Sequence, residues 1–357
     1  MDIDSKFKQK LEKLIFIEVK KEAVEELFNT KLINKENIFI PVESSYITKE
    51  ILETLKLESI PLNKIVKSIF LILGADSEFE YNNIYKALVI KNEEAIKYIK
   101  GEIASYVKEK NYEDAYLLLK GLISVDDEDE NIEKAIWILE TLRGEEKEFI
   151  KEELELIEYL KTINSYDLPY FYEALIYKDE EEYEKAILAI EECLKREGEF
   201  KTQSLNLRET ILQSLNYEDG KSLIYDDPKK ALEKLLPLVK SHEENSMLFY
   251  HIAVAYRIIG NYQKAIYYLN ESRSIDSDIL EVVNELGLNY ASMGDYSNAI
   301  IYFKKGFEVS QNVEFCTNLA VSYLKIGDKK NAEIYISKGK QISPEDDIIT
   351  EIERTIK

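Results

Sequence analysis

Along most of this chain, apolar side chains recur every three or four residues, and charged side chains fill the positions between them. This spacing places the apolar positions on one face of an α-helix, whereas a half-buried strand would alternate every second residue. Glycine and proline, which interrupt helices, account for only 12 and 6 of the 357 residues. The pattern therefore predicts an all-α chain of long helices and short turns, with little or no sheet.

The N-terminal quarter has a less regular pattern than the rest of the chain. We expect a loop around residues 34–45, which include the apolar stretch IFIPV. The expected helices cover residues 4–29, 48–57, 62–73 and 78–90. This N-terminal helical region, residues 1–95, is interpreted either as degenerate repeats or as a separate helical cap.

A period of about 34 residues organises the C-terminal part of the chain. Three copies of one pattern occupy residues 249–276, 283–310 and 316–344. In each copy a small residue stands three residues before a tyrosine, a glycine follows the tyrosine by four, and an alanine follows the glycine by five. The small residues are Ala253, Gly287 and Ala320; the tyrosines are Tyr256, Tyr290 and Tyr323; the glycines are Gly260, Gly294 and Gly327; the alanines are Ala265, Ala299 and Ala332.

These residues and their spacing resemble the tetratricopeptide repeat family, in which each repeat is a pair of antiparallel helices. The resemblance implies a right-handed α-solenoid of stacked helix pairs, a tetratricopeptide-like superhelix, because no repeat buries its apolar face alone. The small residues let the two helices of a pair approach closely. Each glycine suits the left-handed backbone of a sharp turn between them.

Weaker copies extend the pattern toward the N-terminus. Residues 103–123 and 170–194 keep the tyrosine and alanine spacing but lack the turn glycine. Between them, residues 132–142 and 146–164 are interpreted as a helix pair without the signature. The degenerate copies therefore continue the array well beyond the three clear ones.

An irregular copy joins the weak and the clear repeats. It covers residues 200–239, and an insertion around residues 216–227 is expected to lengthen its turn. The sequence thus predicts four parts. These are the N-terminal helical region 1–95, degenerate repeat-like helix pairs in 96–245, three well-formed repeats in 246–346, and a C-terminal capping helix in 347–357.

Charge restricts the classes of partner. The formal charge is −22, and residues 96–200 alone hold 14 basic and 29 acidic side chains. Such a surface repels phosphate groups, so we expect no nucleic-acid partner. The most apolar run, residues 65–74, is too short to cross a bilayer, so we expect no membrane insertion. The two distant cysteines, Cys193 and Cys316, favour a cytoplasmic protein with buried, reduced thiols.

The chain offers little that could support catalysis. Its two histidines, His242 and His251, belong to no spacing typical of a metal site or a catalytic group. The acidic runs at residues 126–130 and 179–182 lack the glycine and the terminal glutamate of a calcium loop. We therefore expect no catalytic residue, no metal and no cofactor. Trp137 stands in an apolar helical stretch, and we expect it in the core.

In solenoids of this family the first helix of every pair lines a concave face. Helical spacing in the three clear repeats selects twelve residues on that side of the first helices. They are Met247, Tyr250, Val254, Arg257, Glu281, Asn284, Leu288, Ala291, Glu314, Thr317, Val321 and Leu324. Because this face is apolar with acidic edges, we expect it to bind an extended or helical protein segment with apolar anchors and basic flanks.

Two functions fit these expectations. The first is a non-enzymatic scaffold or adaptor that binds a protein or peptide on the concave face. The alternative resembles bacterial peptide-sensing solenoids, in which a bound peptide changes the curvature of the superhelix and so regulates another protein. The sequence leaves the identity of the partner and the oligomeric state open.

Overall fold

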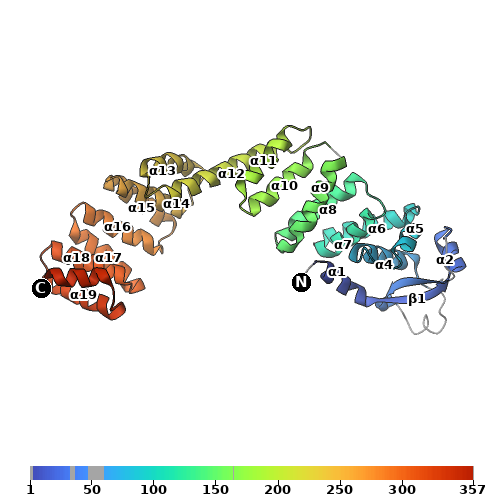
Figure 1. Cartoon of the computed structure of the whole chain (residues 1–357), viewed down its shortest axis with the longest axis horizontal. Helices are drawn as coiled ribbons and strands as arrows, with labels where there is room; N and C mark the ends of the chain where they lie inside the picture. The colour runs from blue at the N-terminus through green and yellow to red at the C-terminus, as the bar shows by residue number, and fades with distance from the viewer. Residues whose placement is uncertain (1–2, 33–36, 47–59, 164, 357) are drawn as a thin grey trace. The chain divides into compact units, whose positions relative to one another are not determined.

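The computed structural model describes residues 3–32, 37–46, 60–163 and 165–356 (Figure 1). The chain forms two compact units, Met1–Arg208 and Glu209–Lys357. In both units most of the described chain is helical, and consecutive helices pack side by side as stacked pairs. The all-α solenoid predicted from the sequence is therefore confirmed, with one addition at the N-terminal end of unit 1. The finer four-part division stays a prediction.

The addition is a two-stranded antiparallel sheet. Strand β1 (Leu14–Lys20) pairs with β2 (Asn37–Glu43) in a register that places Ile17 opposite Ile40. Short helices flank the strands: α1 (Ile3–Lys10), η1 (Leu11–Lys13), α2 (Lys21–Phe28) and η2 (Ser44–Tyr46).

The helix predicted over residues 4–29 and the loop predicted around residues 34–45 are therefore wrong. Both strands are short apolar runs rich in isoleucine and valine, and such runs cannot be assigned by periodicity alone. The alternate side chains of Ile38, Ile40 and Val42 are buried against the helices of unit 1, which stabilises the strand. The helix predicted over residues 48–57 lies outside the described residues.

The predicted helices over residues 62–73 and 78–90 are present as α4 (Leu62–Ala75) and α5 (Asn82–Val89). After them, unit 1 continues as helix pairs: α6 (Glu93–Lys108) with α7 (Tyr112–Ile123), α8 (Asp129–Arg143) with α9 (Ile150–Ile163), and α10 (Leu168–Asp179) with α11 (Tyr183–Leu194). The short helix η4 (Lys147–Phe149) precedes α9.

Helices α4 and α7 cross with their backbones in contact. A Cβ atom added to Gly74 would lie 2.0 Å from the carbonyl oxygen of Leu117, and one added to Gly121 would lie 2.2 Å from that of Phe70. No side chain fits between the helices at this point, so the two glycines set the distance between the N-terminal region and the first repeat-like pair.

A buried charge cluster joins α8, α9 and α10. Arg143 donates from Nε to Glu153 Oε2 at 2.8 Å and from Nη1 to Asp179. Glu153 is fully buried, and its Oε1 has no hydrogen-bond partner among the described residues. Burial raises the pKa of Glu153 to about 7, although the charge of Arg143 opposes this shift.

Two local predictions are wrong. Trp137, expected in the core, is 42% exposed on α8, where its ring contacts Tyr112 edge to face. The insertion around residues 216–227 does not lengthen a turn, because the chain continues to Ser222 as helix α12 (Lys201–Ser222). The first strong helix breaker after it is Pro228, which begins α13.

Unit 2 contains the three clear repeats as helix pairs. Its elements after α12 are α13 (Pro228–Leu235), η5 (Leu236–Lys240), the pairs α14 (Ser246–Ile258) with α15 (Tyr262–Ile275), α16 (Leu280–Ser292) with α17 (Tyr296–Ser310) and α18 (Val313–Lys325) with α19 (Lys329–Ile342), and finally α20 (Asp347–Ile356). We call α14, α16 and α18 the first helices and α15, α17 and α19 the second helices. The signature alanines Ala265, Ala299 and Ala332 are fully buried.

The predicted left-handed glycine turns are confirmed. Gly260, Gly294 and Gly327 have φ angles of 79°, 82° and 82°. The residue after each glycine then caps the second helix, because its side-chain oxygen accepts a hydrogen bond from a backbone N–H in the first turn. These capping residues are Asn261, Asp295 and Asp328.

The weak repeats make the same turn without glycine. Lys110 and Glu181, which stand where the clear repeats have glycine, have φ angles of 60° and 59°. The N–H of Glu182 donates to the carbonyl of Tyr177, just as that of Asn261 donates to Tyr256. The weak repeats thus keep the backbone geometry of the turn, although positive φ is strained for a residue that carries a side chain.

Glu181→Gly is expected to raise the free energy of unfolding of unit 1 by about 1 kcal/mol, because glycine adopts positive φ without steric cost. Urea denaturation followed by the fluorescence of Trp137, the one tryptophan of the chain, measures this in unit 1. Gly260→Ala, at a φ of 79° in unit 2, is the opposite control and should destabilise the chain by a similar amount, seen by circular dichroism. A loss of stability in Glu181→Gly would contradict the prediction.

Candidate functional site

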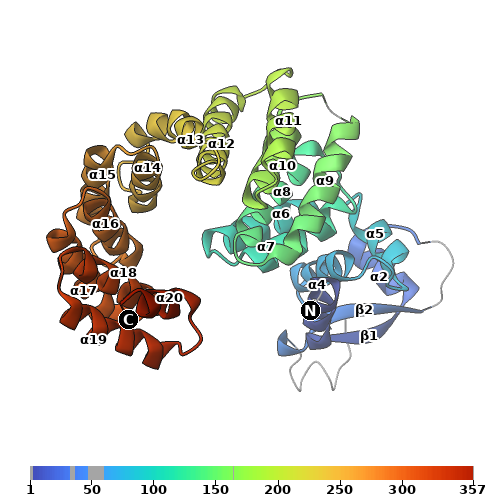
Figure 2. The same ribbon diagram turned by 60° about the vertical axis from the view of Figure 1, so that its left-hand side comes forward.

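The first helices of unit 2 form one continuous surface. We call it the first-helix face, and it is the side of α14, α16 and α18 that carries the twelve residues selected above. Side-chain hydrogen bonds connect α14 to α16 and α16 to α18 across it. Figure 2 gives a second view of these helices in unit 2. Because each bond joins equivalent helices of neighbouring repeats, the face runs across all three repeats.

The link from α14 to α16 is an ion pair with two hydrogen bonds. Arg257 donates from Nε to Glu285 Oε2 at 2.6 Å and from Nη2 to Glu285 Oε1 at 3.1 Å. Glu285 is only 6% exposed, so the planar guanidinium is held in a fixed position at the edge of the face. Arg257 is therefore not a free cation for a ligand.

The link from α16 to α18 is formed by amide side chains. Asn284 Nδ2 donates to Glu314 Oε1 at 2.8 Å, and Asn318 Nδ2 donates to Asn284 Oδ1 at 3.2 Å. Asn318 stands one repeat after Glu285, and Thr317 stands one repeat after Asn284. A ligand that uses either amide must replace these bonds, so this row is pre-organised but already occupied.

Apolar side chains lie beside the polar row. Val321 is 38% exposed, and Leu288 and Leu324 are half-buried. Tyr250 packs its ring at 5.3 Å from that of His251, and burial raises the pKa of its hydroxyl to about 12. These side chains offer a ligand apolar contact area next to hydrogen-bonding groups.

The structure brings most of the predicted residues to this face, with differing exposure. Glu281 and Glu314 are exposed, whereas Val254 is 2% exposed and belongs to the core shared with α13. Val254 therefore presents no surface to a ligand. The half-buried members are Met247, Tyr250, Arg257, Asn284, Leu288, Ala291, Thr317 and Leu324.

Three polar residues at or beneath the face were missed by the sequence analysis: Glu285, Asn289 and Asn318. Asn289 is fully buried, donates to the carbonyl oxygen of Glu285, and its Oδ1 has no partner among the described residues. Asn318 follows Glu285 by the 33 residues that separate the last two repeats, and it lies one position beyond Thr317, the residue that helical spacing selected. None of the three gave a signal in the sequence, because their roles depend on packing between repeats.

His251, Cys193 and Cys316, which the sequence analysis considered for catalysis or metal binding, contact neighbouring side chains within the fold. His251 accepts or donates through Nδ1 to the Tyr217 hydroxyl at 3.0 Å, and burial lowers its pKa to about 4. Cys193 and Cys316 are free and buried, as predicted for both thiols. Within the part of the chain that the structure describes, no group of three or more His, Cys, Asp or Glu side chains could hold a metal ion.

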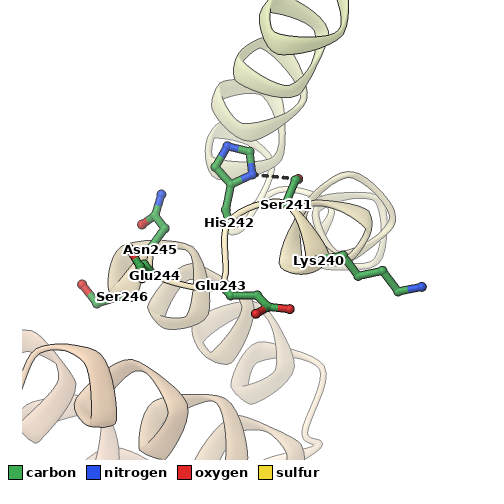
Figure 3. A pocket seen from close by; sticks show the side chains of 7 residues that line it. All are labelled: Lys240, Ser241, His242, Glu243, Glu244, Asn245 and Ser246. Carbon is green, nitrogen blue, oxygen red and sulfur yellow. Dashed lines mark hydrogen bonds between the residues drawn. The ribbon is translucent and has the colours of Figure 1, made fainter. Parts of the chain in front are cut away.

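A hollow of about 670 Å³ lies at the turn before α14, lined by Lys240–Ser246 (Figure 3). Three of its polar side chains form hydrogen bonds within the turn. Ser241 Oγ lies 2.9 Å from His242 Nδ1, and Asn245 Oδ1 accepts from the N–H of Leu248 at 3.0 Å to cap α14. The hollow is therefore part of a helix start and presents no convergent set of catalytic groups.

Among the described helices, none is both long and apolar enough to span a bilayer.

Comparison with known proteins identifies the repeat. Residues 170–200, 280–312 and 313–346 match the family model described as tetratricopeptide repeat. The first of these ranges is one of the weak copies, and the other two are clear copies that contain α16–α17 and α18–α19. A search of curated protein sequences finds no match to this chain.

Several solved structures are similar to parts of the chain. A MamA protein is 21% identical and covers 48% of this chain and 88% of its own, with a TM-score of 0.36. YrrB, described as a tetratricopeptide repeat protein with an unusual peptide-binding site, is 17% identical over 55% of this chain and 96% of its own, with a TM-score of 0.41. PilF of Pseudomonas aeruginosa is 14% identical over 74% and 98%, with a TM-score of 0.36.

Proposed function

We propose that this chain, which carries tetratricopeptide repeats, is a protein-binding scaffold that holds a segment of a partner protein on the first-helix face of unit 2. The observation that carries the proposal is the row of hydrogen bonds that joins α14, α16 and α18 into one surface. A surface fixed in this way loses little conformational freedom when a ligand binds, which favours affinity.

The chemistry of the face indicates the kind of segment it would bind. Exposed Val321 and the half-buried Leu288 and Leu324 offer apolar contacts, so the segment needs apolar anchors. Glu281 and Glu314 are exposed at the edge and carry negative charge. Lysine or arginine residues beside the anchors of the segment would complement them.

Reversing the charge at the edge should weaken such a complex. We expect Glu281→Lys combined with Glu314→Lys to lower the affinity for basic partner segments about tenfold or more, since each change replaces attraction by repulsion. The measurement is quantitative affinity capture from a lysate of the native organism, followed by titration of each captured segment as a synthetic peptide.

A matched control makes the same change of charge at a different place in unit 2. Glu243→Lys with Glu244→Lys, in the exposed turn before α14, should leave the captured segments and their affinities unchanged. Partners lost equally in both variants, or retained in both, would remove the first-helix face from the proposal.

The peptide-sensing alternative uses the same face and differs in the effect of binding. In a sensor, the bound segment would change the dimensions of unit 2, which small-angle scattering of the full chain would detect. A scaffold would bind the same segment without that change.

A further inference from the structure

The second helices of unit 2 expose one apolar side chain at the same position of every repeat. Two residues after each signature alanine stand Tyr267, Ile301 and Ile334, and they are 57%, 52% and 43% exposed. We call these three residues the outer row. They lie on helices that follow one another along one side of unit 2 (Figure 2), and they do not belong to the first-helix face.

Basic side chains accompany the outer row. The second helices carry eight basic and three acidic residues, in a chain whose net charge is −22. Lys304 and Lys305 follow Ile301 by three and four positions, and Lys330 and Lys338 stand four positions before and after Ile334. Residues three or four apart share one side of a helix, so these ammonium groups flank the outer row.

Most of these cations have no carboxylate partner. Among the described residues, Lys340 alone of the eight lies within 4.0 Å of a carboxylate, that of Glu353. By the same measure, eleven of the fourteen basic side chains in residues 96–200 are paired. Lys304, Lys305 and Lys338 lie over tyrosine rings instead. In so acidic a chain, a face of cations without carboxylate partners indicates that the negative charge comes from a different molecule.

The chain itself shows how this repeat position is covered. In the repeat-like pair α6–α7, the residue two after Ala115 is Leu117, which is fully buried. Helix α4 lies across it, with Gly74 against the Leu117 carbonyl oxygen. In unit 1, a helix therefore covers this position of the repeat.

We propose that the outer row is a second binding surface, which takes an acidic amphipathic helix of a partner protein. In an amphipathic helix, residues about seven positions apart lie on the same side, so they can contact one surface. A helix that crosses the second helices would therefore place apolar residues about seven positions apart against the outer row. Aspartate or glutamate beside them would pair with Lys304, Lys305 and Lys338. This surface is independent of the first-helix face.

The test uses the full chain and a defined probe. The probe is a labelled helical peptide with leucine at every seventh position, each flanked by glutamates on the same side, and its binding is followed by fluorescence anisotropy. The control peptide carries lysine in place of every glutamate. We expect the acidic peptide to saturate the protein and the basic peptide to bind at least about tenfold more weakly.

Protein variants locate the binding. Lys305→Glu with Lys338→Glu, and separately Ile301→Ser with Ile334→Ser, should each weaken the acidic peptide about tenfold or more. Lys229→Glu with Lys325→Glu makes the same change of charge at exposed positions off the second helices and should leave binding unchanged. Glu281→Lys with Glu314→Lys should also leave the affinity within about twofold, which separates this surface from the first-helix face.

Three results would overturn the proposal. The first is no binding of the acidic peptide up to about 1 mM. The second is an equal loss of affinity for the acidic peptide in the control variant, Lys229→Glu with Lys325→Glu. The third is binding to vesicles of phosphatidylcholine and phosphatidylserine without binding to the peptide, which would assign the face to an anionic membrane.

Discussion

Replacing Gly121 with alanine is expected to lower the free energy of unfolding of unit 1 by about 3 kcal/mol. The new methyl group would lie 2.2 Å from the carbonyl oxygen of Phe70, which belongs to the backbone of α4 and cannot rotate away. The two helices must separate, and the buried side chains beside the crossing lose contacts. Urea denaturation followed by Trp137 fluorescence measures the loss.

Gly101→Ala is the matched control for this change. Gly101 is also in a helix of unit 1, α6, but a Cβ atom there would meet nothing within 4 Å. Alanine favours a helix over glycine, so this variant should gain about 1 kcal/mol. If Gly121→Ala were as stable as Gly101→Ala, the close crossing of α4 and α7 would be wrong.

Arg143→Met is the second change with a large expected effect, a loss of about 3–5 kcal/mol from unit 1. Methionine fills much of the space of the arginine but leaves Glu153 buried without its cation. Breaking a buried pair on one side costs more than the pair contributes, because the remaining charge stays desolvated. The double variant Arg143→Met with Glu153→Leu removes both charges and should recover most of the stability.

Lys178→Met is the control for the loss of a cation. Lys178 pairs with the same Asp179 that Arg143 contacts, but it is at the exposed end of the cluster. Surface pairs of this kind contribute little, so a change of about 0.5 kcal/mol or less is expected. A large loss of stability in Lys178→Met would mean that the number of cations in the cluster, and not their burial, determines the free energy of unfolding.

The loss in Arg143→Met should depend on pH. Burial raises the pKa of Glu153 to about 7, above its ordinary value of 4.5, so the folded chain binds this proton more tightly than the unfolded chain. The stability that Glu153 contributes is complete below its ordinary pKa and falls as pH rises through the folded value. Without Arg143 the folded pKa rises further, and the difference from the wild type should be larger at pH 8 than at pH 5, as measured by parallel urea titrations.

The sequence predicted unit 2 well because its determinants are local and repeated. Gly260 and Asn261 specify a turn within a few residues, and the same pair of roles recurs in the next two repeats. The weak repeats keep that turn at Lys110 and Glu181, where no glycine marks it in the sequence. The periodicity of the tyrosines and of the buried alanines was enough to place these helices.

The N-terminal region could not be predicted in the same way. The pairing of β1 with β2 joins separate segments, and nothing in either strand specifies its partner. The contact of Gly74 with Gly121 likewise joins helices that share no repeat period. Such contacts depend on tertiary packing, which overrides the local preference of short apolar runs.

For the candidate site, helical spacing identified which residues lie on one side of the first helices. It did not identify which of them are buried by neighbouring helices. Val254 lies between Tyr250 and Arg257 along α14, yet the neighbouring α13 contributes to the core that buries it. The hydrogen bonds of Asn284 and Arg257 to the next repeat were equally invisible, since they require the distance between repeats. Whether a partner occupies this face stays a prediction.

The stacking of unit 2 has a consequence for how such a chain can change in evolution. Each helix pair packs mainly on the pairs before and after it, and each carries its own turn and helix cap. A gene duplication or deletion of one whole period would therefore lengthen or shorten the array by one module and leave the remaining modules with familiar neighbours. Selection can adjust the reach of the protein in such steps while the fold is preserved.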